Sequence, residues 1–267
     1  MEQDRISGAA EIEVKVMEHI LHAEDRFSTA LQILQAYPSM GSIWNVVNNA
    51  FLYGEKAAER FDEMRRAQEK VVENASSIMK DGITIATYSR SSTVVRILKK
   101  CAGKKIKVIC SESRPNMEGR RLAIELNGIM DVVITTDAAL LSLVEEADMI
   151  LIGADAFTER GVVNKVGTAA LAFHAKARDI PLYAAAPSSK AFPFVFIKEE
   201  RGEEIWDDPP RGVRVRNVYF DFTPSHLITG FITEEGVIEN KPEFSGRIAE
   251  EIRRIEKIFA ERYQRVR

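Results

Sequence analysis

The first 80 residues carry apolar side chains at the spacing of amphipathic helices. Ile12, Val16 and Ile20 lie one helical turn apart. A longer series with charged residues on its other face follows at Phe61, Met64, Val71, Ala75 and Ile78. The pattern predicts an N-terminal helical domain over residues 1–80. The longer of these helices is expected to stop near Lys80–Gly82, because glycine readily takes the left-handed conformation that terminates helices.

Beyond residue 81 the pattern changes to short, β-rich apolar runs, most of the early ones separated by segments of helical length. The runs are Ile83–Thr87, Ile106–Cys110, Val132–Thr135, Met149–Ile152, Leu182–Ala186, Val218–Phe222 and Ile228–Ile232. Alternating strands and helices predict an α/β fold, in which a Rossmann-like, doubly wound and mostly parallel sheet occupies residues 81–267. Continuous rather than alternating apolar runs fit strands that are covered on both faces. A last helix is expected at 245–263.

Composition narrows the class of protein. The chain has 267 residues and a formal net charge of -3, which gives no general reason to expect nucleic-acid binding. No apolar run approaches the ~20 residues that span a bilayer, and the N-terminus lacks the layout of a signal peptide. Two cysteines are too few for a disulfide framework, and the four histidines show no metal-ligand spacing. We therefore expect a cytoplasmic protein without a membrane partner or a structural metal.

The loop after the first predicted strand is rich in hydroxyl groups. Residues 87–93 combine serines and threonines with Tyr88 and Arg90, immediately before a predicted helix. Free backbone N–H groups at a helix start bind anions, so Ser89, Arg90 and Ser91 are candidate phosphate contacts. Serine and threonine before a helix are also ordinary caps, and the sequence leaves the two interpretations open.

The loop after the second predicted strand adds another basic candidate. Arg114 could hold a phosphate through paired N–H donors. The alternative is an ion pair between Arg114 and Glu112 in the same loop.

The segment from Gly153 to Thr168 is the most informative part of the chain. The apolar run Met149–Ile152 delivers Asp155 to the carboxyl edge of the predicted sheet, where α/β proteins bind ligands. A short loop is then expected to present Asn164 and Lys165 before the next helix. Asp155 could be desolvated enough to serve as a general acid or base. Its alternative roles are a helix cap or an ion pair with Lys165.

Two further polar residues and one charged segment follow. Lys190 comes after the Leu182–Ala186 run, and Asp221 is interpreted as a turn or capping residue rather than a catalytic one. The segment 198–216 places acidic residues before two prolines and arginines after them. It predicts either a solvated excursion or a functional or interface loop. The Gly-x-Gly-x-x-Gly pattern is absent, so no dinucleotide cofactor, or other cofactor, is expected.

The order and spacing of these short motifs resemble one superfamily. It contains the regulatory alpha, beta and delta subunits of translation initiation factor 2B, methylthioribose-1-phosphate isomerase and archaeal ribose-1,5-bisphosphate isomerase. The resemblance covers nearly the whole chain and rests on Arg5–Ala9, Pro38–Met40, Tyr88–Arg90, Glu112–Pro115 with Gly119, Gly153–Asp155, Asn164–Thr168 and Phe220–Pro224.

The resemblance implies roles for particular residues. In the isomerases, a cysteine after the first strand acts with the aspartate of the Gly-Ala-Asp segment to open and rearrange the sugar phosphate. Here Asp155 matches the aspartate, but Tyr88 occupies the cysteine position, as in the alpha subunit of the initiation factor. Cys110 lies inside a predicted strand and is a poor substitute. The phosphate contacts that the resemblance implies are Arg5, Gly8, Ala9, Arg114, Asn164, Lys165 and Lys190.

Three functions are compatible with this pattern. The first is an archaeal initiation-factor-2B-like homodimer or larger homo-oligomer that binds a sugar phosphate or nucleotide and regulates translation or metabolism. A translation factor is a candidate partner for it. The second is an aldose–ketose isomerase, with Asp155 as acid and base and with Ser89 or water in place of the thiol. The third is an assembly subunit with a vestigial pocket. Loss of one member of a catalytic pair favours the first, because binding survives such a loss better than turnover.

Overall fold

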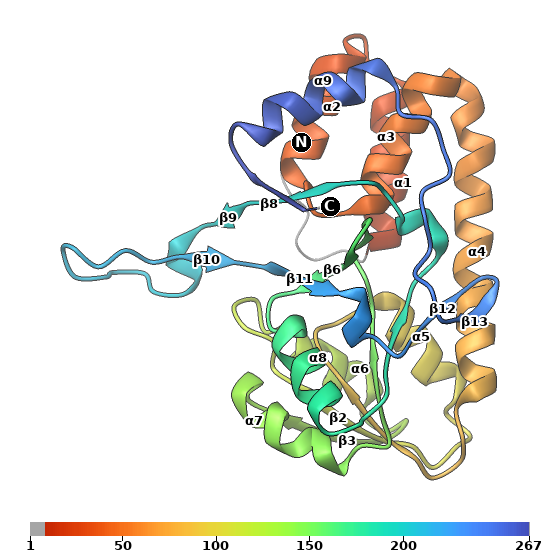
Figure 1. Ribbon diagram of the computed structural model, residues 1–267, viewed down its shortest axis with the longest axis vertical. Helices are drawn as coiled ribbons and strands as arrows, with labels where there is room; N and C mark the ends of the chain where they lie inside the picture. Colours follow the sequence, from red (N-terminus) through yellow and green to blue (C-terminus); the bar gives the residue numbers. More distant parts are fainter. Residues whose placement is uncertain (1–8, 267) are drawn as a thin grey trace.

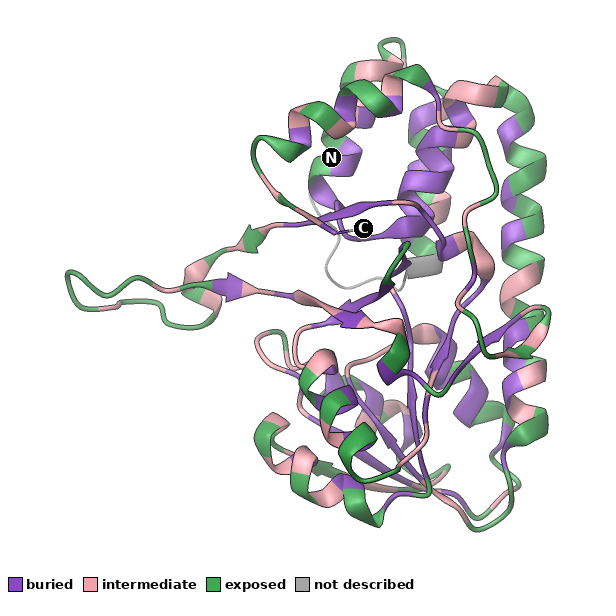
Figure 2. Cartoon of the chain, viewed as in Figure 1, coloured by how far each residue is buried: buried purple, intermediate pink, exposed green. Residues whose placement is uncertain are grey.

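The computed structural model describes the backbone of residues 9–266 and the side chains of residues 11–266 (Figure 1). Its first four helices are α1 (Ala9–Leu21), α2 (Arg26–Ala36), α3 (Gly41–Tyr53) and α4 (Ala57–Ile78). The α2 helix starts where the Asp25 carboxylate accepts the Ser28 N–H at 3.1 Å. The α4 helix buries one face and exposes the other (Figure 2), as its apolar periodicity predicts. Gly82 has a φ of 75°, four residues after α4 ends.

A seven-stranded sheet forms the second half of the architecture. Its strands are β1 (Thr84–Thr87), β2 (Lys107–Ser111), β3 (Asp131–Thr135), β4 (Met149–Ile152), β7 (Leu182–Ala185), β12 (Gly230–Thr233) and β13 (Gly236–Ile238). Their spatial order is β13-β12-β7-β4-β1-β2-β3, and only the β12–β13 pair is antiparallel. The predicted α/β class with a mostly parallel, doubly wound sheet is confirmed.

Helices cover both faces of this sheet, which explains the continuous apolar runs. The covering helices are α5 (Ser92–Lys100), α6 (Glu118–Leu126), α7 (Asp137–Leu143) and α8 (Thr168–Ala177). One face packs against α4, α5 and α6, and the other against α7 and α8. Neighbouring strand residues such as Ile150 and Leu151 therefore point into different apolar clusters, and both are fully buried.

A small antiparallel sheet lies above the main one, and the sequence did not predict its arrangement. It contains β5 (Ala156–Phe157), β6 (Gly161–Lys165) and β11 (Phe220–Pro224), in the order β11-β6-β5. The expected loop carrying Asn164 and Lys165 is therefore strand β6. The apolar run at Val218–Phe222 does form strands, but its β11 part pairs with β6 and not with the main sheet. Pairing over about 60 residues of sequence leaves no local signal.

The C-terminal segments return to the N-terminal helices. The additional elements are β8 (Val195–Ile197), α9 (Glu250–Ala260) and β14 (Gln264–Val266). Trp44 of α3 lies at the centre of an aromatic cluster whose ring centroids are 5.3–5.8 Å from it: Phe192, Phe194, Phe196 and Phe259. The helical layer thus contains residues from both ends of the chain. The predicted last helix is shorter than 245–263, and it packs with residues that were assigned to the first domain. The division at residue 80 into two domains stays a prediction.

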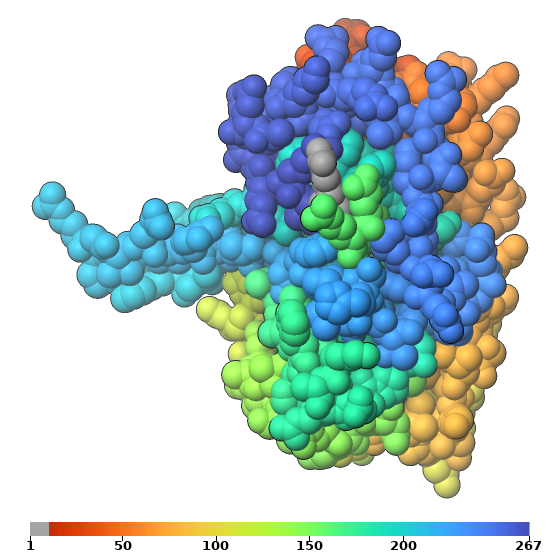
Figure 3. All heavy atoms as spheres, viewed as in Figure 1, coloured from red at the N-terminus to blue at the C-terminus, as the bar shows by residue number. Residues whose placement is uncertain are grey.

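A two-stranded arm projects from the molecule between these two layers (Figures 1 and 3). It leaves through β9 (Glu199–Glu200) and returns through β10 (Asn217–Val218), which pair antiparallel. We call residues 199–218 the arm. Among the described residues, no helix is both long and apolar enough to cross a bilayer.

Candidate functional site

The main pocket lies where the strand order of the sheet reverses. From β1 the chain moves outward to β2 and β3, and then crosses back to β4 on the other side of β1. The carboxyl ends of strands at such a reversal open a crevice in which α/β proteins bind ligands. The pocket has a volume of about 200 Å³, and the helical layer and the base of the arm close it. It is lined by residues that follow β1, β2, β4 and β7, and by the segment 36–40 before α3.

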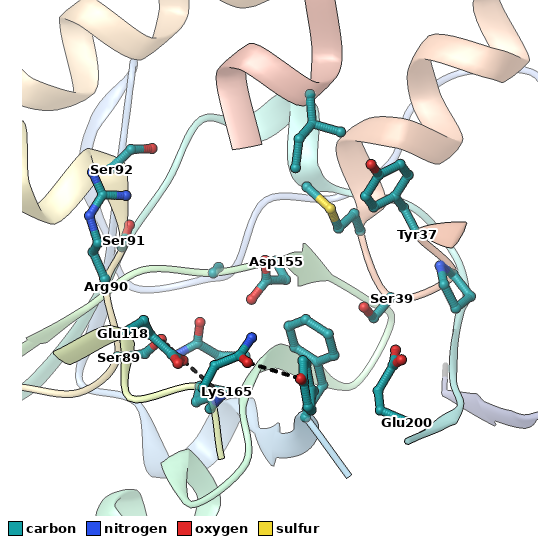
Figure 4. Close-up of a pocket in the computed structure, with 18 of the residues that line it drawn as sticks. Tyr37, Ser39, Ser89, Arg90, Ser91, Ser92, Glu118, Asp155, Lys165 and Glu200 are labelled. Atoms are coloured by element: carbon teal, nitrogen blue, oxygen red, sulfur yellow. Dashed lines mark hydrogen bonds and ion pairs between the residues drawn. The ribbon is translucent and has the colours of Figure 1, made fainter. Parts of the chain in front are cut away.

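Asp155 lies in the wall of this pocket, three residues after β4 (Figure 4). Its backbone is held on both sides, since its N–H donates to Val163 O at 2.8 Å and its C=O accepts the Gly41 N–H at 2.9 Å. Burial raises the pKa of Asp155, and the charges of Lys190 and Lys165 oppose that rise only in part. The carboxyl group therefore holds a proton to a higher pH than an exposed aspartate does, which favours a role in proton transfer.

Two buried lysines, Lys165 and Lys190, lie near Asp155 and line the same pocket. The Lys190 ammonium donates to Ala154 O at 2.6 Å, and Lys190 is 6% exposed. The Lys165 ammonium forms an ion pair with Glu118 Oε1 at 2.8 Å and lies 4.8 Å from the centre of the Tyr219 ring. The expected alternative for Asp155, an ion pair with Lys165, is therefore replaced by a pair between Lys165 and Glu118. Asn164 also lines the pocket, and its amide donates to Thr168 Oγ1 at 3.1 Å.

Tyr88 is the first residue after β1, and its phenol forms a hydrogen bond within the protein. Its hydroxyl donates to Val166 O at 2.8 Å. Burial, together with the carboxylates of Asp137, Asp221 and Glu118, raises the pKa of Tyr88 well above its usual range. Gly167, with a φ of 105°, makes room for the ring, because a Cβ there would lie 2.4 Å from the phenol oxygen. At neutral pH this phenol stays protonated and is a structural group.

The rest of the β1 loop lines the pocket but is largely occupied by protein contacts. Ser89 donates its Oγ–H to Glu118 Oε1 at 2.9 Å, and Arg90 Nε donates to Glu125 Oε1 at 2.5 Å. Ser91 accepts the Val94 N–H at 3.5 Å, so it caps α5 as the structural interpretation of these hydroxyls predicted. This cap lies against Gly153, where a Cβ would clash with Ser91 Oγ at 2.4 Å. The loops after β1 and β4 therefore touch, and both line the pocket.

The remaining predicted contacts fall outside this group. Arg114 is half-buried in the loop after β2 but is not among the described residues that line the pocket. Its backbone N–H binds the Asp137 carboxylate at 2.8 Å, and Glu112 pairs with Arg120 at 2.8 Å, so the predicted alternative of a Glu112–Arg114 ion pair is not formed. Arg5 and Gly8 lie outside the described residues, as does the side chain of Ala9. Their phosphate contacts stay predictions.

Two secondary interpretations of the sequence agree with the structure. The Asp221 carboxylate accepts the N–H groups of Gly167 and Ala169 at 2.7 and 3.2 Å, so it caps the start of α8. Burial raises the pKa of Asp221 to about 6, although these two hydrogen bonds oppose the rise. Cys110 is fully buried in β2, and burial raises the pKa of its thiol to about 11. It is therefore a poor nucleophile, as expected.

The sequence missed several residues of the pocket. Glu118 is the first residue of α6, and the base of the arm contributes Lys198, Glu200 and Tyr219. Glu118 had one available signal, an acidic residue in the first turn of a predicted helix. Lys198 and Glu200 lie in the segment 198–216, which the sequence marked as a solvated excursion or a functional or interface loop, but only the fold shows that they reach the pocket. Glu13 of α1 is also close to Lys190, and burial raises the pKa of its carboxyl despite that cation.

The pocket combines an excess of basic groups with buried carboxylates. Its charged lining residues are Arg90, Arg121, Lys165, Lys190 and Lys198 against Glu118, Asp155 and Glu200. Within residues 11–266, no group of three or more His, Cys, Asp or Glu side chains could hold a metal ion. The fold and site therefore define a class, a doubly wound α/β protein with a polar, basic cleft at the switch point of its sheet.

Comparison with known proteins places the chain within that class. Residues 22–240 match the model of the initiation factor 2 subunit family, and the chain belongs to this family. It is 35% identical to a Pyrococcus abyssi protein named as translation initiation factor eIF-2B subunit 2-like, over 89% of this chain and 93% of that one. It is 34% identical to the ribose 1,5-bisphosphate isomerase of Methanocaldococcus jannaschii, over 77% and 74% of the two chains.

A solved structure supports the same relationship. The Pyrococcus horikoshii translation initiation factor eIF-2B superposes with a TM-score of 0.77 at 32% identity, covering 88% of this chain and 93% of the other. Relatives with a factor's name and relatives with an isomerase's name are thus similarly close in sequence. Similarity establishes the family of this chain, but it does not distinguish a factor-like function from an isomerase activity.

Proposed function

We propose that this protein binds a small phosphorylated ligand, a sugar phosphate or a nucleotide, and acts as a regulatory rather than a strongly catalytic member of its family. The observation that carries the proposal is that Asp155, Lys165 and Lys190 line one pocket at the sheet edge together with Tyr88, whose phenol donates to Val166 O. The charged residues that would bind the ligand are present, whereas Tyr88 stands where the resemblance implies a reactive thiol.

The charges of the lining support an anionic ligand. Five basic side chains face three carboxylates, and the start of α5 with Ser91 and Ser92 adds helix N–H dipoles at one side. Among the described residues, the buried oxygen Oε2 of Glu118 has no hydrogen-bond partner. A ligand hydroxyl would satisfy it, and a sugar carries such donors beside its phosphate.

Replacement of the family's thiol supports a role other than turnover. Both cysteines of the chain, Cys101 and Cys110, are buried away from the pocket lining. Tyr88 cannot serve as a thiolate would, since its pKa is raised and its hydroxyl is bound to a carbonyl. The family resemblance assigns the thiol and the aspartate joint roles in the isomerases, so a site with the aspartate alone retains binding better than chemistry.

One observation favours a second candidate, an aldose–ketose isomerase that uses Asp155. The raised pKa of this carboxyl, beside two ammonium groups, suits proton transfer to and from a sugar phosphate. A relative that bears the name ribose 1,5-bisphosphate isomerase fits the same idea. In that case Asp155→Asn would abolish turnover of ribose 1,5-bisphosphate while its binding survived.

Titration calorimetry with ribose phosphates and nucleoside monophosphates tests the proposal directly. We expect at least one of them to bind, with ribose 1,5-bisphosphate unchanged after prolonged incubation with the protein. Absence of binding to all of these compounds by a folded protein would overturn the proposal. Turnover that depends on Asp155 would replace it with the isomerase. A translation-factor partner is a further part of the proposal, tested by co-purification in the presence of the bound compound.

A further inference from the structure

A second cavity, of about 300 Å³, lies beside the short helix η3 (Ser188–Lys190). Its walls come from α3, the first half of α4, η3 and the connection between β13 and α9 (Figure 1). Lys190 lines the main pocket, whereas Ser188 and Ser189 line the second cavity. Among the described residues, the two cavities have no lining residue in common, so the second one is a separate candidate site.

Buried amide side chains hold the walls of this cavity in fixed positions. Asn45 of α3 donates to Ser189 O at 2.7 Å and to Ala191 O at 2.8 Å. Asn48, also of α3, donates to Arg247 O at 2.8 Å. Both asparagines are buried. Because buried hydrogen bonds join α3 to η3 and to the connection before α9, the fold sets the shape of the cavity.

Several charged groups of the cavity have no counter-charge in the protein. Among the described residues, neither Arg60 nor Arg247 forms an ion pair, and the Glu63 carboxylate forms none either. The Arg60 guanidinium lies 4.3 Å from the centre of the Tyr53 ring, a contact that orients the cation without neutralising it. These three charged side chains can therefore pair with a ligand.

The balance of charge in the lining favours a ligand that carries both signs. The charged lining residues are Arg60, Arg247, Glu63, Glu234 and Glu243. A simple anion would face an excess of carboxylates, and a simple cation would leave both guanidinium groups unpaired. A ligand with a carboxylate and an ammonium group satisfies both kinds of residue, because arginine pairs with carboxylates and glutamate accepts hydrogen bonds from ammonium groups. Free amino acids carry this pair of groups on one carbon atom.

An apolar part of the lining narrows the class of amino acid. Leu52, Met64 and Phe244 line the same cavity; Met64 is buried and the other two are half-buried. We propose that the cavity binds a free amino acid with an apolar side chain, its carboxylate at the two arginines and its ammonium group at Glu63. This inference does not depend on what the main pocket binds, because the two sites are lined by different residues.

Titration calorimetry on the whole protein tests the proposal. The probes are L-leucine, L-methionine and L-phenylalanine, each compared with its analogue that lacks the ammonium group and its analogue that lacks the carboxylate. We expect at least one amino acid to bind, and both of its analogues to bind about tenfold or more weakly, because each has lost one set of charge-assisted hydrogen bonds. Absence of binding by all three amino acids, or an analogue that binds as tightly as its parent, would overturn the proposal.

Matched variants of α4 locate the site. Arg60→Met and Glu63→Gln remove charges that line the cavity, whereas Arg65→Met and Glu69→Gln change exposed residues of the same helix outside it. We expect each of the first two to weaken amino-acid binding by about tenfold or more, and each of the others to leave it unchanged. Circular dichroism checks that all four fold. Equal affinities of the four variants would place the amino acid elsewhere and overturn the proposal, and binding of ribose phosphates to the same proteins reports on the main pocket separately.

Discussion

The two sides of the pocket are both formed by loops that follow parallel strands, but they present different groups to the cavity. On the β4 side, Asp155 and the buried lysines direct charge into the cavity. On the β1 side, Tyr88 and Ser91 are engaged in holding neighbouring backbone, and Arg90 is paired with Glu125. Both loops follow parallel strands at the same edge of the sheet, so their position alone predicts the same role for each. The difference lies in the kind of group: buried charged side chains line the β4 side, whereas hydrogen-bonded hydroxyl groups and an ion-paired arginine line the β1 side.

This contrast indicates how binding and chemistry can separate within one family. Under the proposed function, the buried charge of the β4 side holds the ligand. The resemblance implies that the isomerases carry a reactive thiol after the first strand, and here a hydrogen-bonded phenol occupies that position. Variants of single residues on each side should therefore have different consequences.

The largest effect is expected from breaking the ion pair on the β4 side. Lys165→Met leaves the Glu118 carboxylate without its partner, and loss of one member of a buried pair costs about 3–5 kcal/mol. Arg178→Met is the control, because Arg178 and Glu145 form a similarly short pair at 2.7 Å but are about half exposed, which limits the loss to about 1 kcal/mol. Urea denaturation at pH 7 measures both. Equal losses would mean that burial does not distinguish the β4 side.

The second prediction concerns the pH dependence of stability through Asp221. Burial raises the pKa of this group from 3.8 to about 6, so between these values the unfolded chain ionises while the folded protein keeps the proton. Stability is therefore lost as pH rises through this window, by about 3 kcal/mol at 1.36 kcal/mol for each pH unit. Asp221→Asn should remove that loss.

Unfolding free energies of wild type and Asp221→Asn, measured at pH 4 and pH 7.5, test this prediction. Asp155 and Glu13 also have raised pKa values, but they are present in both proteins, and the difference between the proteins isolates Asp221. Parallel pH profiles would mean that the carboxylate capping α8 is stabilised by its two N–H donors as much as it is destabilised by burial.

The third prediction concerns which lysine of the pocket binds the phosphorylated ligand. Lys190→Met should weaken the binding of ribose 1,5-bisphosphate by about 1.5–3 kcal/mol, the range for a hydrogen bond to a charged group. Lys198→Met is the matched control. Its ammonium lines the same pocket but is already paired with Glu200 at 3.4 Å and hydrogen-bonded to Gln35 O at 3.2 Å. Calorimetry that found the larger loss for Lys198 would move the anion site to the base of the arm.

The smallest effect is expected on the β1 side. Tyr88→Phe removes the hydrogen bond to Val166 O and should cost about 1 kcal/mol of stability. Ligand affinity should stay the same, because the phenol is directed at the protein backbone. Thermal denaturation and calorimetry measure the two quantities. A loss of affinity greater than the loss of stability would give Tyr88 a direct role in the ligand site.

Local pattern was enough for much of the fold and part of the site. The strand at Met149–Ile152 and the position of Asp155 after it follow from a short apolar run, because strand ends in a doubly wound sheet share an edge. The capping role of Asp221 followed from turn chemistry. Arg114 is the counterexample. Its loop was placed correctly, but its side chain does not reach the lining, and no local pattern states where an arginine points.

The sequence by itself determined the alternation of elements, the edge at which they end, and the presence of a tyrosine rather than a cysteine at position 88. These properties depend on hydrophobic period and residue identity, which are local. Only the tertiary structure decided that Glu118 takes the Lys165 ammonium, that Tyr88 and Gly167 interlock, and that the base of the arm closes the pocket. Those outcomes arise because buried charges and donors take whichever partners the packed chain brings within hydrogen-bond distance, and such partners are set by the fold and not by separation along the chain.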